Sequence, residues 1–177
     1  MPHALAERAD RDKEIIVLAD RGLADDKNLV RTLEGNVVIT QGTMRITAAK
    51  VTVQEKDKFN YYVAWGSPVT FREKREKTDG WIEGTAERAE WDDRNEVLKL
   101  FNRAKVKNAQ SEITGELITY DMRKEVAEVT GAPPSQKVPE EKSRVKVIIV
   151  PQKGANAPGK PEAPKDAATL KTDKEMK

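Results

Sequence analysis

The chain of 177 residues contains no cysteine and only one histidine, His3. Without cysteine, the chain forms no disulfide, carries out no thiol catalysis and holds no metal through a thiolate. It also lacks any run of 18 or more apolar residues, so we expect neither a membrane-spanning helix nor a signal peptide in it. Side-chain chemistry is therefore scarce, and the remaining evidence is in the strand pattern.

Catalytic motifs are missing as well. The sequence has no G-x-S-x-G, no phosphate-binding glycine loop and no pair of metal ligands at a useful spacing. His3 is close to a terminus that we expect to be loose, and Glu83 in "GWIEG" is a single carboxylate on a strand. We therefore predict a protein that is not an enzyme and that has no catalytic residues, no metal site and no cofactor.

The charge is unevenly distributed. The net charge is +2, yet residues 132–177 contain 10 Lys and Arg against 6 Asp and Glu, which leaves residues 1–131 slightly acidic. A nucleic-acid-binding domain concentrates basic side chains on its folded surface. We therefore expect no nucleic-acid partner.

Most of the chain alternates apolar and polar residues in runs of about five or six, the period and length of β-strands. Gly, Asn and Asp separate many of these runs. The pattern predicts an all-β fold with strands at 14–19, 28–34, 36–41, 43–48, 50–55, 60–65, 68–73, 81–90, 96–101, 103–108, 111–115, 117–121, 124–129 and 144–150.

The chain also repeats itself. Residues 19–54 align without a gap on residues 86–121, so that "ADDKN" falls on "WDDRN" and Ile46-Thr47 falls on Ile113-Thr114. Repeated strand units predict stacked neighbours that cover each other's apolar faces. Adjacent Asp side chains on a strand point to opposite faces, and Asp and Asn favour tight turns. We interpret both Asp-Asp motifs as turns rather than calcium ligands.

Composition predicts three regions. Residues 1–13 are expected to be a flexible N-terminus, residues 14–152 a β domain, and residues 153–177 a disordered tail rich in Lys, Pro and Ala. The segment 131–143, "GAPPSQKVPEEKS", is typical of a linker.

Five quoted stretches, in this order, resemble the LptA-type (OstA-like) family of periplasmic lipopolysaccharide-transport proteins. The first, "LEGNVVITQGTMRITAAKVTV", resembles the family's Gly-Asn-Val strand, QG turn and A-x-K-V-x-V strand. The others are "GSPVTF", "EGTAERAEWDDRNEVLKLFNRAKV", "SEITGELITYD" and "RVKVIIVPQ". Together they cover residues 14–152, and their order and spacing are more specific than any one of them.

The resemblance implies a twisted, open β-jellyroll shaped like a V, with lipid acyl chains held in an apolar groove between two sheets. It implies a non-enzymatic carrier that moves lipopolysaccharide across the periplasm from the inner to the outer membrane, its signal peptide having been removed. It also implies head-to-tail stacking with copies of itself and docking to an inner-membrane-anchored partner and an outer-membrane barrel partner.

The alternating apolar positions of the strands are the expected groove lining, although the same pattern also fits a closed sandwich core. The predicted lipid-binding residues are Ile15, Val17, Leu33, Val37, Ile39, Met44, Ile46, Val51, Val53, Phe71, Leu98, Leu100, Val106, Ile113, Ile118 and Tyr120.

The terminal strands are rich in β-branched residues and suit strand-by-strand pairing between molecules. The predicted edge residues for stacking and partner docking are Ile15, Ile16, Val17, Val145, Val147 and Ile149. An alternative function is a carbohydrate-binding or adhesive β-sandwich, in which Trp65, Trp81 and Trp91 would stack against sugars.

Overall fold

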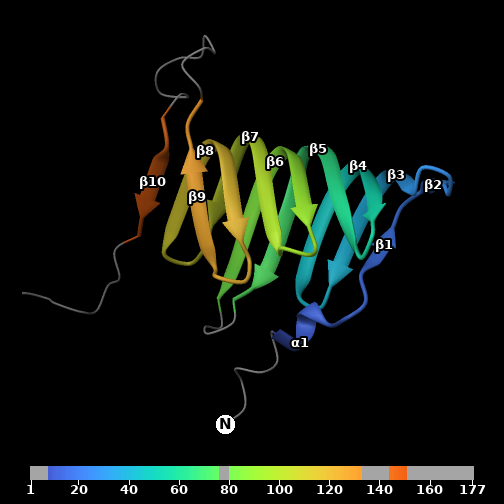
Figure 1. Ribbon diagram of the computed structural model, residues 1–177. Coiled ribbons are helices and arrows are strands. Elements are labelled where there is room, and N and C mark those ends of the chain that lie inside the picture. Colours follow the sequence, from blue (N-terminus) through green and yellow to red (C-terminus); the bar gives the residue numbers. More distant parts are fainter. Residues whose placement is uncertain (1–7, 76–79, 133–143, 151–177) are drawn as a thin grey trace, which may run out of the picture.

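The computed structural model describes residues 8–75, 80–132 and 144–150 (Figure 1). In these ranges it contains one helical turn, α1, followed by strands that form a single antiparallel sheet. No helix in the described ranges is long and apolar enough to span a bilayer. The elements are α1 (Arg8–Arg11), β1 (Ile16–Leu18), β2 (Arg21–Asp25), β3 (Val30–Gln41), β4 (Met44–Lys56), β5 (Phe59–Lys74), β6 (Trp81–Asp92), β7 (Val97–Lys107), β8 (Ser111–Asp121), β9 (Val126–Thr130) and β10 (Lys146–Ile149).

The sheet runs in chain order from β3 to β8. At one end, β1 and β2 both pair with β3, one on each half of its length. At the other end, β10 and β9 share β8 in the same manner. Because the ladder does not close on itself, the described sheet has two free edges.

Each long strand is interrupted near its middle. The ladders between successive strands shift register at this point in every pair from β3·β4 to β7·β8, for example between Glu34 and Val37 and between Phe101 and Ala104. Such bulges bend strands and increase their twist. The bends fold the sheet over, and Figure 1 shows the strands arching at the top of the view.

The bend divides the sheet into two layers. The first layer consists of β2, β9 and residues 30–34, 50–56, 59–65, 88–92, 97–101 and 117–121. The second layer is built from β1, β10 and residues 37–41, 44–47, 69–74, 81–85, 104–107 and 111–115. The arches join the layers on one side, and we call the side opposite them, where the turns and α1 lie, the open side (Figure 1).

The internal repeat predicted from the sequence is present in the backbone. Gly35 and Asn36 have φ angles of 79° and 46°, and Asn102 and Arg103, which the repeat aligns with them, have 62° and 52°. These residues sit at the bends of β3 and β7, where a left-handed conformation is needed and glycine adopts it most readily. The two copies of the repeat therefore bend their strands at equivalent residues.

The Asp-Asp motifs form turns, as predicted. Asp25 and Asp92 each accept hydrogen bonds from the backbone and side-chain amides of the asparagine three residues later, at 2.8 to 3.1 Å. Asp93 accepts a hydrogen bond from the backbone N–H of Asn60, at the start of the neighbouring strand β5, at 2.9 Å.

The structure corrects several predicted boundaries. The expected strands 28–34 and 36–41 are the two halves of β3, and the same merging gives β4, β5, β7 and β8. β2 was not predicted, because "RGLAD" has no alternating apolar face and is exposed throughout. The terminal strands are shorter than expected, at Ile16–Leu18 and Lys146–Ile149.

Some predictions concern residues outside the described ranges. His3, most of the predicted linker 131–143 and the predicted tail 153–177 belong to this group. Of the predicted flexible N-terminus 1–13, only residues 8–13 are described, and they include α1.

Candidate functional site

The face between the two layers is the candidate site, since it collects almost all the buried apolar side chains. Most of the predicted lining residues lie there with at most 5% of their surface exposed. They are Val37, Ile39, Met44, Ile46, Val51, Val53, Phe71, Leu98, Leu100, Val106, Ile118 and Tyr120.

The two layers touch through this face. The rings of Phe71 in the second layer and Tyr120 in the first have centroids 6.1 Å apart. Gly84, in the second layer, leaves space for Leu100, because a Cβ atom there would lie only 2.9 Å from a methyl group of that leucine. Side chains of the two layers therefore meet at these points, and a molecule that enters there has to displace some of them.

The other predicted lining residues lie at the margins. Ile15, Val17 and Leu33 are half-buried and pack against the interior cluster. Ile113 is half-buried on β8, opposite Val106 of β7.

Sequence reasoning missed further interior residues. They continue the alternation of the predicted strands, so the same period would have found them. They are Ala48, Tyr62, Ala64, Val69, Ile82, Ala86, Ala89, Trp91, Ala104 and Met122. Burial raises the pKa of the Tyr62 hydroxyl to about 12, so this side chain is neutral at physiological pH.

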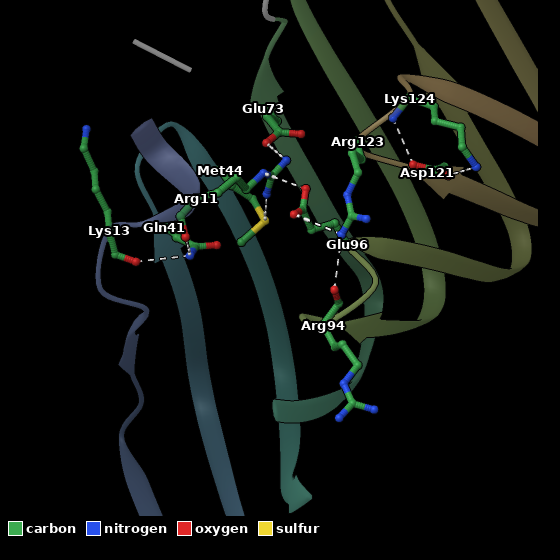
Figure 2. A network of polar contacts seen from close by, with 10 residues as sticks. All are labelled: Arg11, Lys13, Gln41, Met44, Glu73, Arg94, Glu96, Asp121, Arg123 and Lys124. Carbon is green, nitrogen blue, oxygen red and sulfur yellow. Dashed lines mark hydrogen bonds and ion pairs between the residues drawn. The ribbon is translucent and has the colours of Figure 1, made fainter. Parts of the chain in front are cut away.

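A polar network crosses the open side (Figure 2). The buried polar side chains reported for the described residues are Asp10, Gln41 and Glu73, and all three belong to this region. The Arg11 guanidinium lies between the carboxylates of Glu73 in the second layer and Glu96 in the β6–β7 turn of the first, its Nε 3.8 Å from Glu96. Arg11 thus links the two layers.

Glu73 lies where the alternation of β5 calls for an apolar side chain. Val69, Phe71 and Glu73 share one face of the strand, and Glu73 is 8% exposed. Burial raises the pKa of its carboxyl to about 7, partly offset by Arg11. Residues 68–73 were predicted as a strand with Phe71 facing inward. The same alternation places Glu73 inward, so the sequence alone could have identified a buried carboxylate at this position.

A second cross-layer ion pair joins Arg75, after β5, to Glu125, in the β8–β9 turn, at 3.4 Å. Arg11, Arg75, Glu96 and Glu125 lie outside the strands, whereas Glu73 is a residue of β5. Neither ion pair was predicted, because its partners are 50 or more residues apart in the sequence and come together only in the folded chain.

The free sheet edges carry exposed apolar side chains. On β1, Ile16 is 52% exposed, and on β10, Val147 and Ile149 are 54% and 75% exposed. Val145, just before β10, is also exposed, whereas Ile15 and Val17 are half-buried. The two edges are at opposite ends of the sheet (Figure 1).

The tryptophans do not form a common surface. Trp91 is buried in the interior and stacks on Tyr62, with ring centroids 4.7 Å apart. Trp81 is half-buried beneath the Arg72 guanidinium, and only Trp65 is exposed. This arrangement does not support the carbohydrate-binding alternative.

The chain resembles characterised proteins along most of its length. Residues 16–126 match the family model described as LptA/(LptD N-terminal domain) LPS transport protein. The chain is 33% identical over 161 residues to the lipopolysaccharide export system protein LptA of Haemophilus influenzae, covering 89% of this chain and 88% of that protein. It is 29% identical over 154 residues to the lipopolysaccharide export system protein LptH of Pseudomonas aeruginosa, covering 86% and 87%.

The fold has a counterpart among solved structures. The crystal structure of LptH, described as the LptA-homologous periplasmic component of the conserved lipopolysaccharide transport device from Pseudomonas aeruginosa, superimposes with a TM-score of 0.74 at 26% identity. The match covers 80% of this chain and 99% of that one.

Proposed function

The chain belongs to the LptA/(LptD N-terminal domain) family of lipopolysaccharide transport proteins, and from this premise we propose that it carries lipopolysaccharide across the periplasm. The family match over residues 16–126 is the observation that supports this most directly, because it spans the strands that build the apolar interior. The role is that of a carrier and requires no chemical reaction.

The physical need for such a carrier follows from the hydrophobic effect. Moving an acyl chain from lipid into water is unfavourable by about 0.8 kcal/mol for each CH₂ group. A lipid with several chains therefore does not cross an aqueous compartment unaided. A continuous apolar path removes most of this barrier, and it works best when no single point along it binds tightly.

In our proposal, the acyl chains enter between the two layers and contact the interior face. This face continues from β3 to β8 through adjoining buried side chains, such as Ile46 and Phe71, which are register partners on β4 and β5. Since the layers pack against each other in this structure, binding requires them to separate. The sugar and phosphate groups stay in water at the open side.

The free edges provide a means of forming a longer path. We propose that the β9–β10 edge of one molecule pairs with the β1–β2 edge of the next, so that the interior faces line up end to end. Two different edges meet in such a contact, so it is heterologous and does not close. The same edges are proposed to dock the inner-membrane-anchored partner and the outer-membrane barrel partner.

Site-specific photo-crosslinking tests the lipid path. A photoreactive residue at Ile39 or Ile118, both on the interior face, is expected to capture lipopolysaccharide. Matched labels at Arg45 and Lys99, which are exposed on β4 and β7, should capture none. Equal lipid capture at all four sites, or capture only of protein from the interior, would contradict the proposal.

A further inference from the structure

Access to the interior has to come from the open side or from the ends, because on the opposite side the strands themselves run from one layer into the other. Separating the layers there would break the sheet. At the open side, the side chain of Arg11, at the end of α1, reaches Glu73 and Glu96 (Figure 2).

α1 is firmly attached to the second layer. The backbone N–H of Thr43 donates to the Asp10 carboxylate at 2.8 Å, and the Gln41 side-chain amide donates to the carbonyl oxygens of Arg11 and Lys13 at 2.7 and 3.1 Å. Asp10 also packs against Gly42, whose positive φ and missing Cβ leave room for it. All of these contacts involve the end of β3 or the β3–β4 turn.

The connection of α1 to the first layer is weaker. Among the described residues, α1 is linked to the first layer by the ion pair between Arg11 and Glu96, at 3.8 Å. At 3.8 Å this pair is too long for a hydrogen bond, whereas α1 is held to the second layer by hydrogen bonds of 2.7 to 3.1 Å. The segment is therefore anchored on one side and loosely held on the other, which is the construction of a latch.

A hollow beside α1 is lined by both charged and apolar side chains, as a binding site for an amphiphilic molecule would be. Three cations, Arg11, Lys58 and Arg94, and two carboxylates, Asp93 and Glu96, line it, so its charged groups sum to +1. The rest of the lining is Gln41 and the apolar or aromatic side chains of Ile15, Phe59 and Trp91. A phosphate group suits the cations, and hydrocarbon suits the rings. Arg11 is thus placed to exchange an internal carboxylate for an anionic group of a guest.

We propose that α1 and Arg11 form a latch that closes the interior in the empty protein and opens when a phosphate of the incoming lipid draws Arg11 away from Glu96. This inference rests on the proposed function for the identity of the lipid, but the latch itself is a property of the empty protein. Arg75 and Glu125 form a second tie of the same kind.

The test uses Arg11→Gln, which removes the guanidinium charge, and Glu96→Gln, which removes the first-layer partner of Arg11 and also the pair of Glu96 with Arg123 at 3.4 Å. Arg31→Gln is the matched control, because Arg31 pairs with Glu55 at 3.2 Å within the first layer. The chain has no cysteine, so spin labels attach only at introduced ones. Labels at Lys99, exposed on the first layer, and at Gln110, exposed in the β7–β8 turn that joins two strands of the second layer, report the layer separation.

Without lipid, both latch variants should shift the spin–spin distance distribution to longer values, while Arg31→Gln matches the wild type. Initial uptake of lipopolysaccharide should be about 5-fold faster in the latch variants, the equivalent of about 1 kcal/mol. Wild-type uptake should slow when the lipid is dephosphorylated, and Arg11→Gln should lose this dependence.

The outcomes separate the two proposals. Distances in both latch variants that are indistinguishable from the control would overturn the latch, whatever happens to lipid. If instead the distances lengthen but no variant takes up lipopolysaccharide, the latch stands as a conformational device and the proposed function fails.

Discussion

Glu73 is the residue at which the apolar interior is interrupted. A carboxylate on an inward-facing strand position is unfavourable unless it is paired or protonated. Four charged groups act on it besides burial: Arg11 favours its ionised form, and Glu125, Asp10 and Glu96 disfavour it. Its position therefore suits the proposed latch, in which Arg11 changes partners.

We expect the stability of the wild type to fall as pH rises through about 7, and Glu73→Gln to abolish this fall. The folded state raises the pKa of Glu73 from 4.5 to about 7, so between these values the folded chain binds more protons than the unfolded chain. Stability therefore decreases with rising pH in this window. The decrease from pH 5 to pH 8 should be on the order of 2–3 kcal/mol.

Urea unfolding at pH 5, 6, 7 and 8 measures this slope. Glu55→Gln, at an exposed carboxylate on β4, is the control and should keep the wild-type slope. A slope that is the same in wild type and Glu73→Gln would show that Glu73 does not carry the pH dependence.

At the scale of elements, the sequence predicted strands well and their continuity poorly. Period-2 alternation found both halves of β3 and of β7, since burial on one face is written into consecutive residues. It did not show that 28–34 and 36–41 form one bent strand, because a bulge looks like a break when the partner strand is unknown. The internal repeat was the better guide to the bends, as the similar φ angles of Asn36 and Arg103, 46° and 52°, show.

β5 and β8 lie in different positions of the sheet but meet through the interior. Phe71 on β5 is 2% exposed and its ring contacts that of Tyr120 on β8. We expect Phe71→Ala to destabilise the fold by about 3–5 kcal/mol, because it removes a buried ring from the contact between the layers. Chemical denaturation followed by circular dichroism measures the change.

Phe101→Ala is the matched control. Phe101 on β7 is only half-buried and lies beneath the Arg88 guanidinium, 4.3 Å from its ring centroid, so its loss should cost clearly less. Equal effects of the two substitutions would mean that the interior contact contributes no more than an outer one, and that the layers are held together chiefly elsewhere.

At the scale of the whole molecule, the apolar interior could be predicted and its closure could not. Alternation placed Ile39, Leu100 and Ile118 inside without any knowledge of the layers. The latch depends on Arg11, Glu73 and Glu96, which lie far apart in the chain and carry no local signal in common. Long-range electrostatic pairs of this kind become visible only once the sheet has folded over.

The molecule has two different free edges, and we expect it to associate through them. Wild-type protein should show scattering curves of elongated particles whose length grows with concentration. A Val147→Lys, Ile149→Lys double variant places charges on the β10 edge, a substitution pattern that blocks strand pairing between molecules. It should remain monomeric, while the control Trp65→Lys, on the central strand β5, should still elongate.

Mixing distinguishes head-to-tail stacking from a symmetric contact. The double variant keeps an intact β1–β2 edge, so it should add to the β9–β10 end of a wild-type stack and stop its growth, shortening the particles in proportion to the amount added. If the particles instead formed by pairing of two β10 edges, the variant would be excluded and wild-type lengths would not change. Unchanged lengths in the mixture would therefore rule out the head-to-tail arrangement, even if the wild type elongates on its own.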